Sequence, residues 1–188
     1  GVKSWYSSWE IDGSGGQSDE SDYSLMIGPS MKLSYGKYFG GISVMTAVPE
    51  YEFSAFDWGR TDVDLLMGFF IHPRVSLIGG WKYLRGSTDQ FNSHSAYGPA
   101  IGTSFNYPVL NQRATLYFNA GLLLLNGNLK SQNLATGGTN ETDYDLWGYS
   151  FEGGVAFALY KSITLNLGYK YQNIDWQNAA NDIVAGAT

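Results

Sequence analysis

The feature that most constrains this chain is an alternation, with a period of two, of large apolar residues with small or polar ones. It is clearest over residues 143–160, where one set of alternate residues is mostly large and apolar and the other is small or polar. The first set is Trp147, Tyr149, Phe151, Gly153, Val155, Phe157 and Leu159, and the second is Gly148, Ser150, Glu152, Gly154, Ala156 and Ala158. Successive side chains of a β-strand point to opposite faces, so the pattern predicts a strand with one apolar and one polar face.

The same alternation recurs along the chain, and no segment has a persuasive helical period. It is clear in residues 23–33, 63–71, 75–83, 97–106, 114–122 and 162–172, and weaker near 2–11 and 38–47. Short connections near 35–37, 72–74, 108–112 and 160–162 alternate with long ones rich in Gly, Ser, Asn and Asp. This regular exchange of short turns and long loops is typical of an up-and-down antiparallel β-barrel. The sequence therefore predicts an all-β fold.

Composition excludes several classes of protein. The 188 residues include no cysteine, which excludes a disulfide framework and a thiolate metal site. A formal net charge of −6 argues against a nucleic-acid partner. The longest clean apolar run, 122–125, is far too short for a transmembrane helix, which needs about 20 apolar residues. We expect neither a cofactor nor a metal ion.

Two hairpins have a register that the sequence itself tests. The apolar pairs are Leu65 with Trp81 and Met67 with Gly79 about a turn at Pro73, and Phe151 with Tyr171, Gly153 with Tyr169 and Leu159 with Ile163 about a turn at Lys161. Each register then sets an opposite-charge pair on the inner face, Asp64 with Lys82 and Glu152 with Lys170. Lys32 also falls on the inner face, and Lys3 and Glu10 are further candidates for it. The interior of a narrow barrel is filled by side chains, so we expect these charges to be structural, with a polar path for solutes as the alternative.

In its alternating segments of roughly ten residues, its Tyr and Trp near strand ends and its turn–loop alternation, the chain resembles the small Gram-negative outer-membrane β-barrels, a porin-like superfamily. The resemblance covers nearly the whole chain and implies a single domain over residues 1–188, an up-and-down antiparallel transmembrane barrel in the bacterial outer membrane. About nine strands are complete in the sequence. Bacterial single-chain barrels have even strand numbers, so we expect ten strands with the closing strand missing or partial, or alternatively eight.

The resemblance also implies where aromatic and basic residues lie. Tyr and Trp are expected to form girdles at the two membrane interfaces: Trp5, Trp9, Trp58, Trp81, Tyr83, Trp147, Tyr149, Tyr169, Tyr171 and Trp176. Arg60, Arg85 and Lys130, near the predicted outer rim, are expected to contact lipopolysaccharide phosphates. The expected partners are therefore outer-membrane lipid and lipopolysaccharide, with a protein partner at the long loops.

Our leading functional hypothesis is a non-enzymatic barrel with a structural or interaction role, or with a narrow path for small solutes. A lipid-modifying enzyme embedded in the barrel is one alternative, and a soluble lipocalin-like barrel that binds a small ligand is another. For the enzyme, His94 lies between Ser93 and Ser95 in the sequence. Adjacent residues of a strand point to opposite faces, so we assign no catalytic residue.

Overall fold

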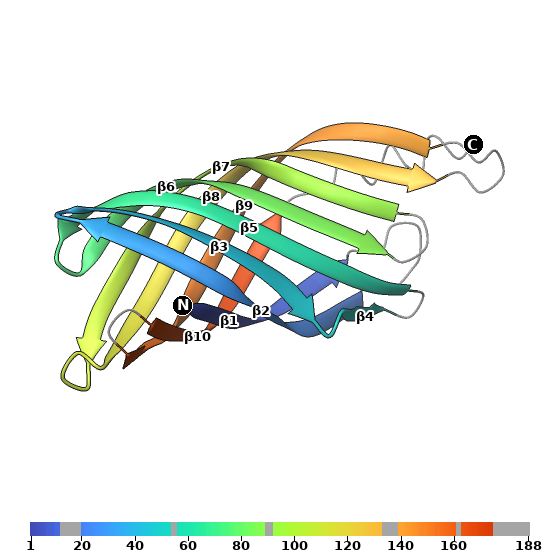
Figure 1. The fold of residues 1–188 in the computed structure, drawn as a ribbon. Helices are drawn as coiled ribbons and strands as arrows, with labels where there is room; N and C mark the ends of the chain where they lie inside the picture. Colours follow the sequence, from blue (N-terminus) through green and yellow to red (C-terminus); the bar gives the residue numbers. More distant parts are fainter. Residues whose placement is uncertain (12–19, 54–55, 89–91, 133–138, 161–162, 175–188) are drawn as a thin grey trace.

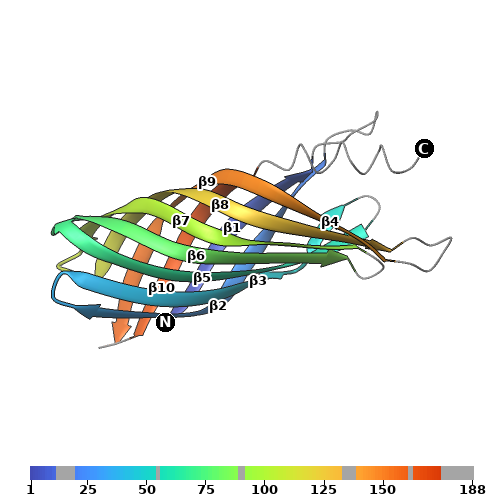
Figure 2. The ribbon, with the colours of Figure 1, turned by 90° about the horizontal axis from the view of Figure 1, so that it is seen from above.

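The computed structural model describes residues 1–11, 20–53, 56–88, 92–132, 139–160 and 163–174, which form a closed β-barrel (Figures 1 and 2). Its strands are β1 (Val2–Ile11), β2 (Glu20–Tyr35), β3 (Tyr38–Val48), β4 (Tyr51–Phe53), β5 (Phe56–His72), β6 (Val75–Thr88), β7 (Asn92–Val109), β8 (Ala114–Gln132), β9 (Thr139–Tyr160) and β10 (Ile163–Ile174). Nine of them form the ring, and the short β4 extends the sheet beside β5. Within the described residues no helix is long and apolar enough to cross a membrane.

The ring closes where β1 meets β10, and these two strands are parallel. They pair from Val2 with Leu165 to Ser7 with Lys170, whereas the other neighbours in the ring are antiparallel. The nine complete strands counted in the sequence are confirmed, and the barrel is antiparallel except where β1 meets β10. The described residues form neither the eight-stranded barrel nor the tenth, closing strand that we expected to be missing or partial. An up-and-down chain with an odd number of strands runs its first and last strands in the same direction, so they can pair only in parallel. A closing strand after Ile174 would lie outside the described residues.

The strands are strongly staggered around the barrel. From Ser4, the register leads through β2, β3, β5 and β6 to Ser95 of β7. In the other direction it leads through β10, β9 and β8 to Tyr107, twelve residues further along the same strand. Strand tilt and stagger are linked in a closed barrel, and a tilt of about 35–45° is typical.

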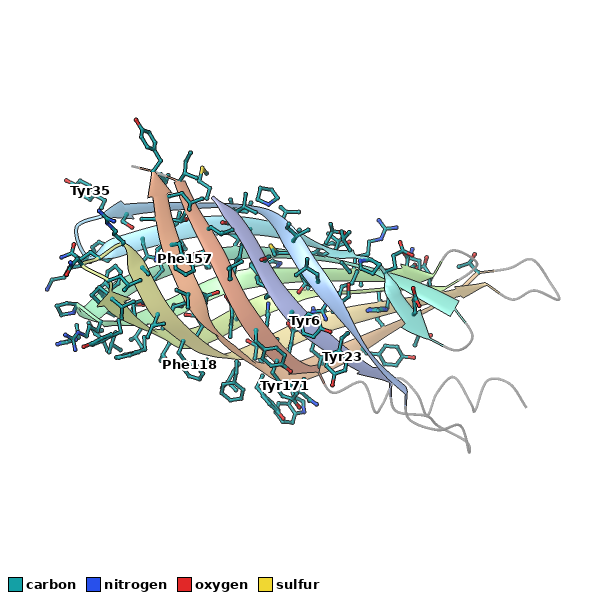
Figure 3. All side chains as sticks on the ribbon, turned by 90° about the horizontal axis from the view of Figure 1, so that it is seen from below. Tyr6, Tyr23, Tyr35, Phe118, Phe157 and Tyr171 are labelled. Atoms are coloured by element: carbon teal, nitrogen blue, oxygen red, sulfur yellow. The ribbon has the colours of Figure 1, made fainter. Side chains whose placement is uncertain are left out.

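The predicted division into two faces is confirmed. The large apolar residues of the alternating segments are exposed on the outside, for example Met67, Ile101 and Leu122, while Asp62 and Lys82 are buried inside. Figure 3 shows the outward side chains on the side of the barrel in view.

Both predicted hairpin registers are confirmed over most of their length. Asp64 lies opposite Lys82, and Glu152 lies opposite Lys170. One predicted pair is wrong, because Ile163 pairs with Tyr160 and not with Leu159. The register shifts between Ile163 and Thr164, directly after the turn.

Glycine on the inner face lets the strongly curved strands approach one another. A Cβ atom on the inward-facing Gly98 would lie only 2.1 Å from the carbonyl oxygen of Leu124 on β8. The outward-facing Gly79 is different, because an added Cβ would have no neighbour within 4 Å. Curvature of a sheet is commonly introduced by glycine at such positions.

We therefore expect Gly98→Ala to lower the free energy of unfolding by about 1–3 kcal/mol, because the backbone of β8 must move away from the new methyl group. Gly79→Ala is the matched control and should change stability by less than about 0.5 kcal/mol. Denaturant titration followed by circular dichroism measures both. Equal stability of the two variants would contradict the close approach of β7 and β8.

Candidate functional site

The outer surface is divided into bands along the barrel axis. Apart from Phe151 of β9, the exposed side chains of the middle are mostly aliphatic: Leu25, Ile27, Met31, Ile42, Val44, Leu65, Met67, Leu77, Ile101, Leu116, Leu122 and Leu167. Aromatic side chains lie on the side of the long loops: Tyr6, Tyr23, Trp81, Tyr83, Tyr97, Trp147, Tyr149, Tyr169 and Tyr171. A second aromatic set lies on the side of the short turns: Tyr35, Tyr38, Phe69, Phe105, Tyr107 and Phe157. We call these sets the loop-side belt and the turn-side belt.

The loop-side belt contains the aromatic residues that the sequence indicated on β6, β9 and β10. Several of its rings pack against each other on the surface. Tyr6 and Tyr23 stack with ring centroids 5.6 Å apart, and Trp81 stacks on Tyr97 at 6.4 Å. In Figure 3, Tyr6, Tyr23 and Tyr171 lie close together, far along the barrel from Tyr35.

Trp5 does not belong to either belt, and its assignment to the membrane interface is corrected. Of the other tryptophans expected there, Trp176 lies outside the described residues, and the side chains of Trp9 and Trp58 are not among those described. Trp5 points into the lumen and is 1% exposed. The ammonium groups of Lys3 and Lys170 lie 4.4 and 4.5 Å from the centroid of its ring, within the range of cation–π attraction. The sequence indicated this orientation, because Trp5 is two residues from Lys3 on β1 and therefore points to the same face.

A network of buried charges crosses the lumen near the middle of the strands. Asp62 is at its centre and is fully buried. Its carboxylate accepts hydrogen bonds from Arg60 Nε at 2.8 Å, Arg60 Nη2 at 2.9 Å and Lys82 Nζ at 2.8 Å. Lys82 Nζ also donates to Asp64 Oδ1 at 3.0 Å, and Lys170 Nζ lies 3.7 Å from Asp64 Oδ2. We call these residues, with Lys3 and Glu152, the lumen network.

The predicted charge pairs are only partly the pairs that form. Asp64 and Lys82 are in contact, as their register implies. Glu152 instead pairs with Lys3 of β1, whose Nζ lies 2.7 Å from its Oε1, while Lys170 turns toward β5. Lys170 is therefore shared between the carboxylates of β5 and the ring of Trp5.

Other predicted basic residues lie elsewhere. Lys32 is near the short turns, where its ammonium lies 4.2 Å from the centroid of the Phe39 ring. Arg60 is buried in the lumen network, so the expectation that it contacts lipopolysaccharide is wrong. Lys130 forms an exposed ion pair with Glu141, and Arg85 is exposed on the outer face. We did not predict Asp62 and Arg60 as lumen charges, although both are an even number of residues from Asp64 on β5 and therefore point to the same face.

The lumen differs at its two ends. Toward the long loops it is filled by a cluster of buried residues, Ala96, Leu123, Leu125, Tyr144 and Leu146. Toward the short turns the inward-facing Asn106, Asn119 and Asn166 are only half-buried. Solvent therefore reaches the turn-side part of the lumen, while the lumen network and the apolar cluster fill the rest.

His94 lies within the loop-side part of the lumen. It is buried, whereas its sequence neighbours Ser93 and Ser95 are half-buried on the alternate face. The arrangement follows the strand alternation and does not bring either neighbouring serine onto the same face as the imidazole. Within the described residues, no group of three or more His, Cys, Asp or Glu side chains is placed to hold a metal ion.

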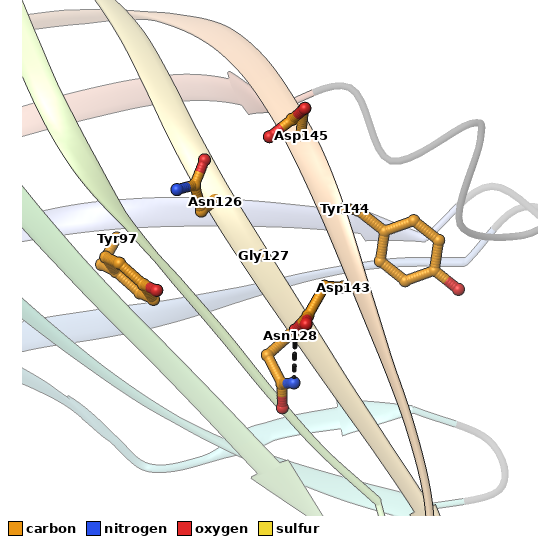
Figure 4. Close-up of a pocket in the computed structure, with 7 residues that line it drawn as sticks. All are labelled: Tyr97, Asn126, Gly127, Asn128, Asp143, Tyr144 and Asp145. Carbon is orange, nitrogen blue, oxygen red and sulfur yellow. Dashed lines mark hydrogen bonds between the residues drawn. The ribbon is translucent and has the colours of Figure 1, made fainter.

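The outer face carries a depression beyond the loop-side belt, on β7, β8 and β9 (Figure 4). Its volume is about 300 Å³, and its lining includes Tyr97, Asn126, Asn128, Asp143 and Asp145. Asn128 Nδ2 donates a hydrogen bond of 2.7 Å to Asp143 Oδ1.

Comparisons of the chain with protein-family models, with curated proteins and with solved structures give no match. Function must therefore be argued from the two belts, the lumen network and the outer depression.

We expect Asp62→Asn to destabilise the barrel by about 3–5 kcal/mol, because Arg60 and Lys82 would keep their buried charges without a carboxylate between them. Glu141→Gln removes a carboxylate from the exposed pair with Lys130 and is the control, with an expected change below about 1 kcal/mol. Denaturant titration measures both. A small effect of Asp62→Asn would contradict a network in which this carboxylate compensates the buried charges of Arg60 and Lys82.

A double-mutant cycle should show whether Glu152 interacts with Lys3, which it contacts, or with Lys170, its cross-strand neighbour. We expect Lys3→Met and Glu152→Gln to show a coupling energy of about 1–3 kcal/mol, because their charged atoms are in contact. The cycle of Lys170→Met with Glu152→Gln should give a smaller coupling, although these two residues are direct cross-strand neighbours. The opposite ranking would contradict the assigned partner of Glu152.

Proposed function

We propose that this chain is an integral outer-membrane β-barrel that is closed to solutes and is not an enzyme, and that it acts through its outer and loop-side surfaces. The observation that carries the proposal is the exposed aliphatic band, which has members on seven of the nine strands of the ring and lies between two aromatic belts. An outward apolar band between girdles of aromatic residues is the surface that a transmembrane barrel presents to lipid.

The dimensions of the band support a membrane location. Trp147 and Phe157 on β9 are ten residues apart, as are Tyr97 and Tyr107 on β7. Ten steps of about 3.3 Å at a tilt of about 40° span about 25 Å along the barrel axis. This is about the height of the apolar band of outer-membrane barrels.

A soluble lipocalin-like barrel is disfavoured by the side on which the apolar residues lie. Such a barrel would keep its large apolar side chains inside and show a polar surface to water. Here the middle of the lumen holds Asp62, Lys82 and Lys170, while Leu65, Met67 and their neighbours in the band are exposed. A continuous exposed apolar surface of this kind would lead to aggregation in water.

The contents of the lumen support a closed barrel. The lumen network crosses the middle, and the apolar cluster around Leu125 lies beyond it toward the long loops. The solvent-accessible part near the short turns therefore has no continuation to the other end. Membrane lipid and lipopolysaccharide would surround the barrel, and a protein partner would meet the loop side.

We expect the protein to require detergent for solubility and to migrate faster on a gel when unheated than after boiling, because a folded barrel resists the detergent of the gel. A monodisperse protein in buffer without detergent would overturn the membrane location.

We expect Leu167→Arg to cost about 2–4 kcal/mol in folding into lipid vesicles, because an outward arginine within the apolar band must enter hydrocarbon. Asn173→Arg lies further along the outer face of β10, near the long loops, and should cost no more than about 1 kcal/mol. In a soluble protein, by contrast, substitution of the exposed Leu167 would be nearly neutral. Denaturant titration in vesicles measures the difference.

We expect the purified barrel to be electrically silent in planar lipid bilayers. Its folded state would be verified by gel migration on the same preparation. Stable single-channel conductance would contradict a closed lumen and restore the solute path as the function.

A further inference from the structure

The depression in Figure 4 is lined by the ring of Tyr97 and by polar side chains of the paired strands β8 and β9. Asn126 lies directly opposite Asp145 in the register of β8 and β9, and Asn128 lies opposite Asp143. Tyr97 of β7 is paired with Asn126 and borders the depression on its other side. All five side chains come from strands of a paired sheet, so their positions do not depend on a loop.

Part of this polar lining is available to a ligand. The amide of Asn128 and the carboxylate of Asp143 are joined to each other. Among the described residues, Asn126 and Asp145 have neither a hydrogen-bond nor an ion-pair partner, although both border the same depression. They offer one amide donor group and several oxygen acceptors beside the exposed ring of Tyr97.

The chemistry of the lining selects the class of ligand. No lysine or arginine lines the depression, so it does not suit a phosphate group. Two carboxylates, one of them already hydrogen-bonded to an amide, do not make a metal site. A volume of about 300 Å³ is at the lower end of the range for small-molecule sites. Amide and carboxylate groups beside an aromatic ring suit a ligand with many hydroxyl groups and an apolar ring face.

The position of the depression selects the source of that ligand. Tyr97 belongs to the loop-side belt and stacks on Trp81, whereas Asn126, Asn128, Asp143 and Asp145 lie on the loop side of it. In the proposed outer-membrane orientation this is the level at which the polar head groups of the outer leaflet begin. We propose that the depression binds a sugar ring of an outer-leaflet glycolipid, an inference that rests on the proposed membrane location.

The test uses the full chain, folded in a non-denaturing detergent. One probe is lipopolysaccharide, whose binding is measured by native mass spectrometry. The other is its core oligosaccharide without the lipid, whose binding is measured by isothermal titration calorimetry. We expect Asn126→Ala and Asp145→Ala each to weaken the binding of lipopolysaccharide about fivefold, the effect of losing about one hydrogen bond. Asn173→Ala is the matched control, because it removes an exposed outer-face amide outside the depression, and it should leave binding unchanged.

The two probes distinguish the sources of the sugar. Binding of both probes, weakened by the same two variants, supports recognition of the sugar itself. Binding of lipopolysaccharide alone, weakened by the same variants, supports a glycolipid whose acyl chains add affinity on the apolar band. Equal binding of lipopolysaccharide by the wild type and both variants overturns the site. A barrel that is heat-modifiable yet fails this test overturns only the sugar site, whereas a detergent-free soluble protein overturns the membrane location.

Discussion

The barrel depends on how its first and last strands meet. The backbone pairing of β1 with β10 ends at Ser7 and Lys170, although each strand continues along its other neighbour. Side chains strengthen this short seam from inside. The ring of Trp5 on β1 lies near two ammonium groups, one of them from β10, and Lys3 reaches past β10 to Glu152 of β9. Closure is therefore achieved by hydrogen bonds within the sheet and by charges that bridge three strands.

The same charges explain why the lumen is both stable and filled. A charge removed from water needs a close partner, and two of the lysines in the lumen network find theirs on strands that are not neighbours. Lys170 of β10 approaches Asp62 and Asp64 of β5, and Lys3 of β1 pairs with Glu152 of β9. Lys82 of β6 instead binds the two carboxylates of its neighbour β5. The contacts of Lys170 join the two sides of the barrel through its interior.

Much of the fold was predictable because a period of two is a local property of the sequence. It fixed the inner and outer faces, and apolar pairing fixed the two hairpin registers, which place Asp64 beside Lys82. The residues indicated nine complete strands, as observed, whereas the expected total of ten or eight came from the even-number rule for outer-membrane barrels. Closure joins Val2 to Leu165, and no local pattern indicates that contact.

The candidate sites were harder to predict, because they too depend on contacts between distant parts of the chain. Register identifies the nearest neighbour of Glu152, but a long lysine side chain from the next strand but one reaches it instead. Trp5 was assigned to the interface from its residue type, although its parity on β1 placed it inside. The outer depression needs three strands at once, because Tyr97 and Asp145 face a common space only after β7, β8 and β9 are aligned.

An odd number of strands also gives the chain a direction across the barrel. Gly1 lies at the end of the short turns, where its amino group donates to the carbonyl of Ser30, and β10 finishes at Ile174 on the side of the long loops. An even-stranded meander would return its last residue to the side on which it started. In the proposed membrane location, the start of β1 and the end of β10 would therefore lie on opposite sides of the bilayer.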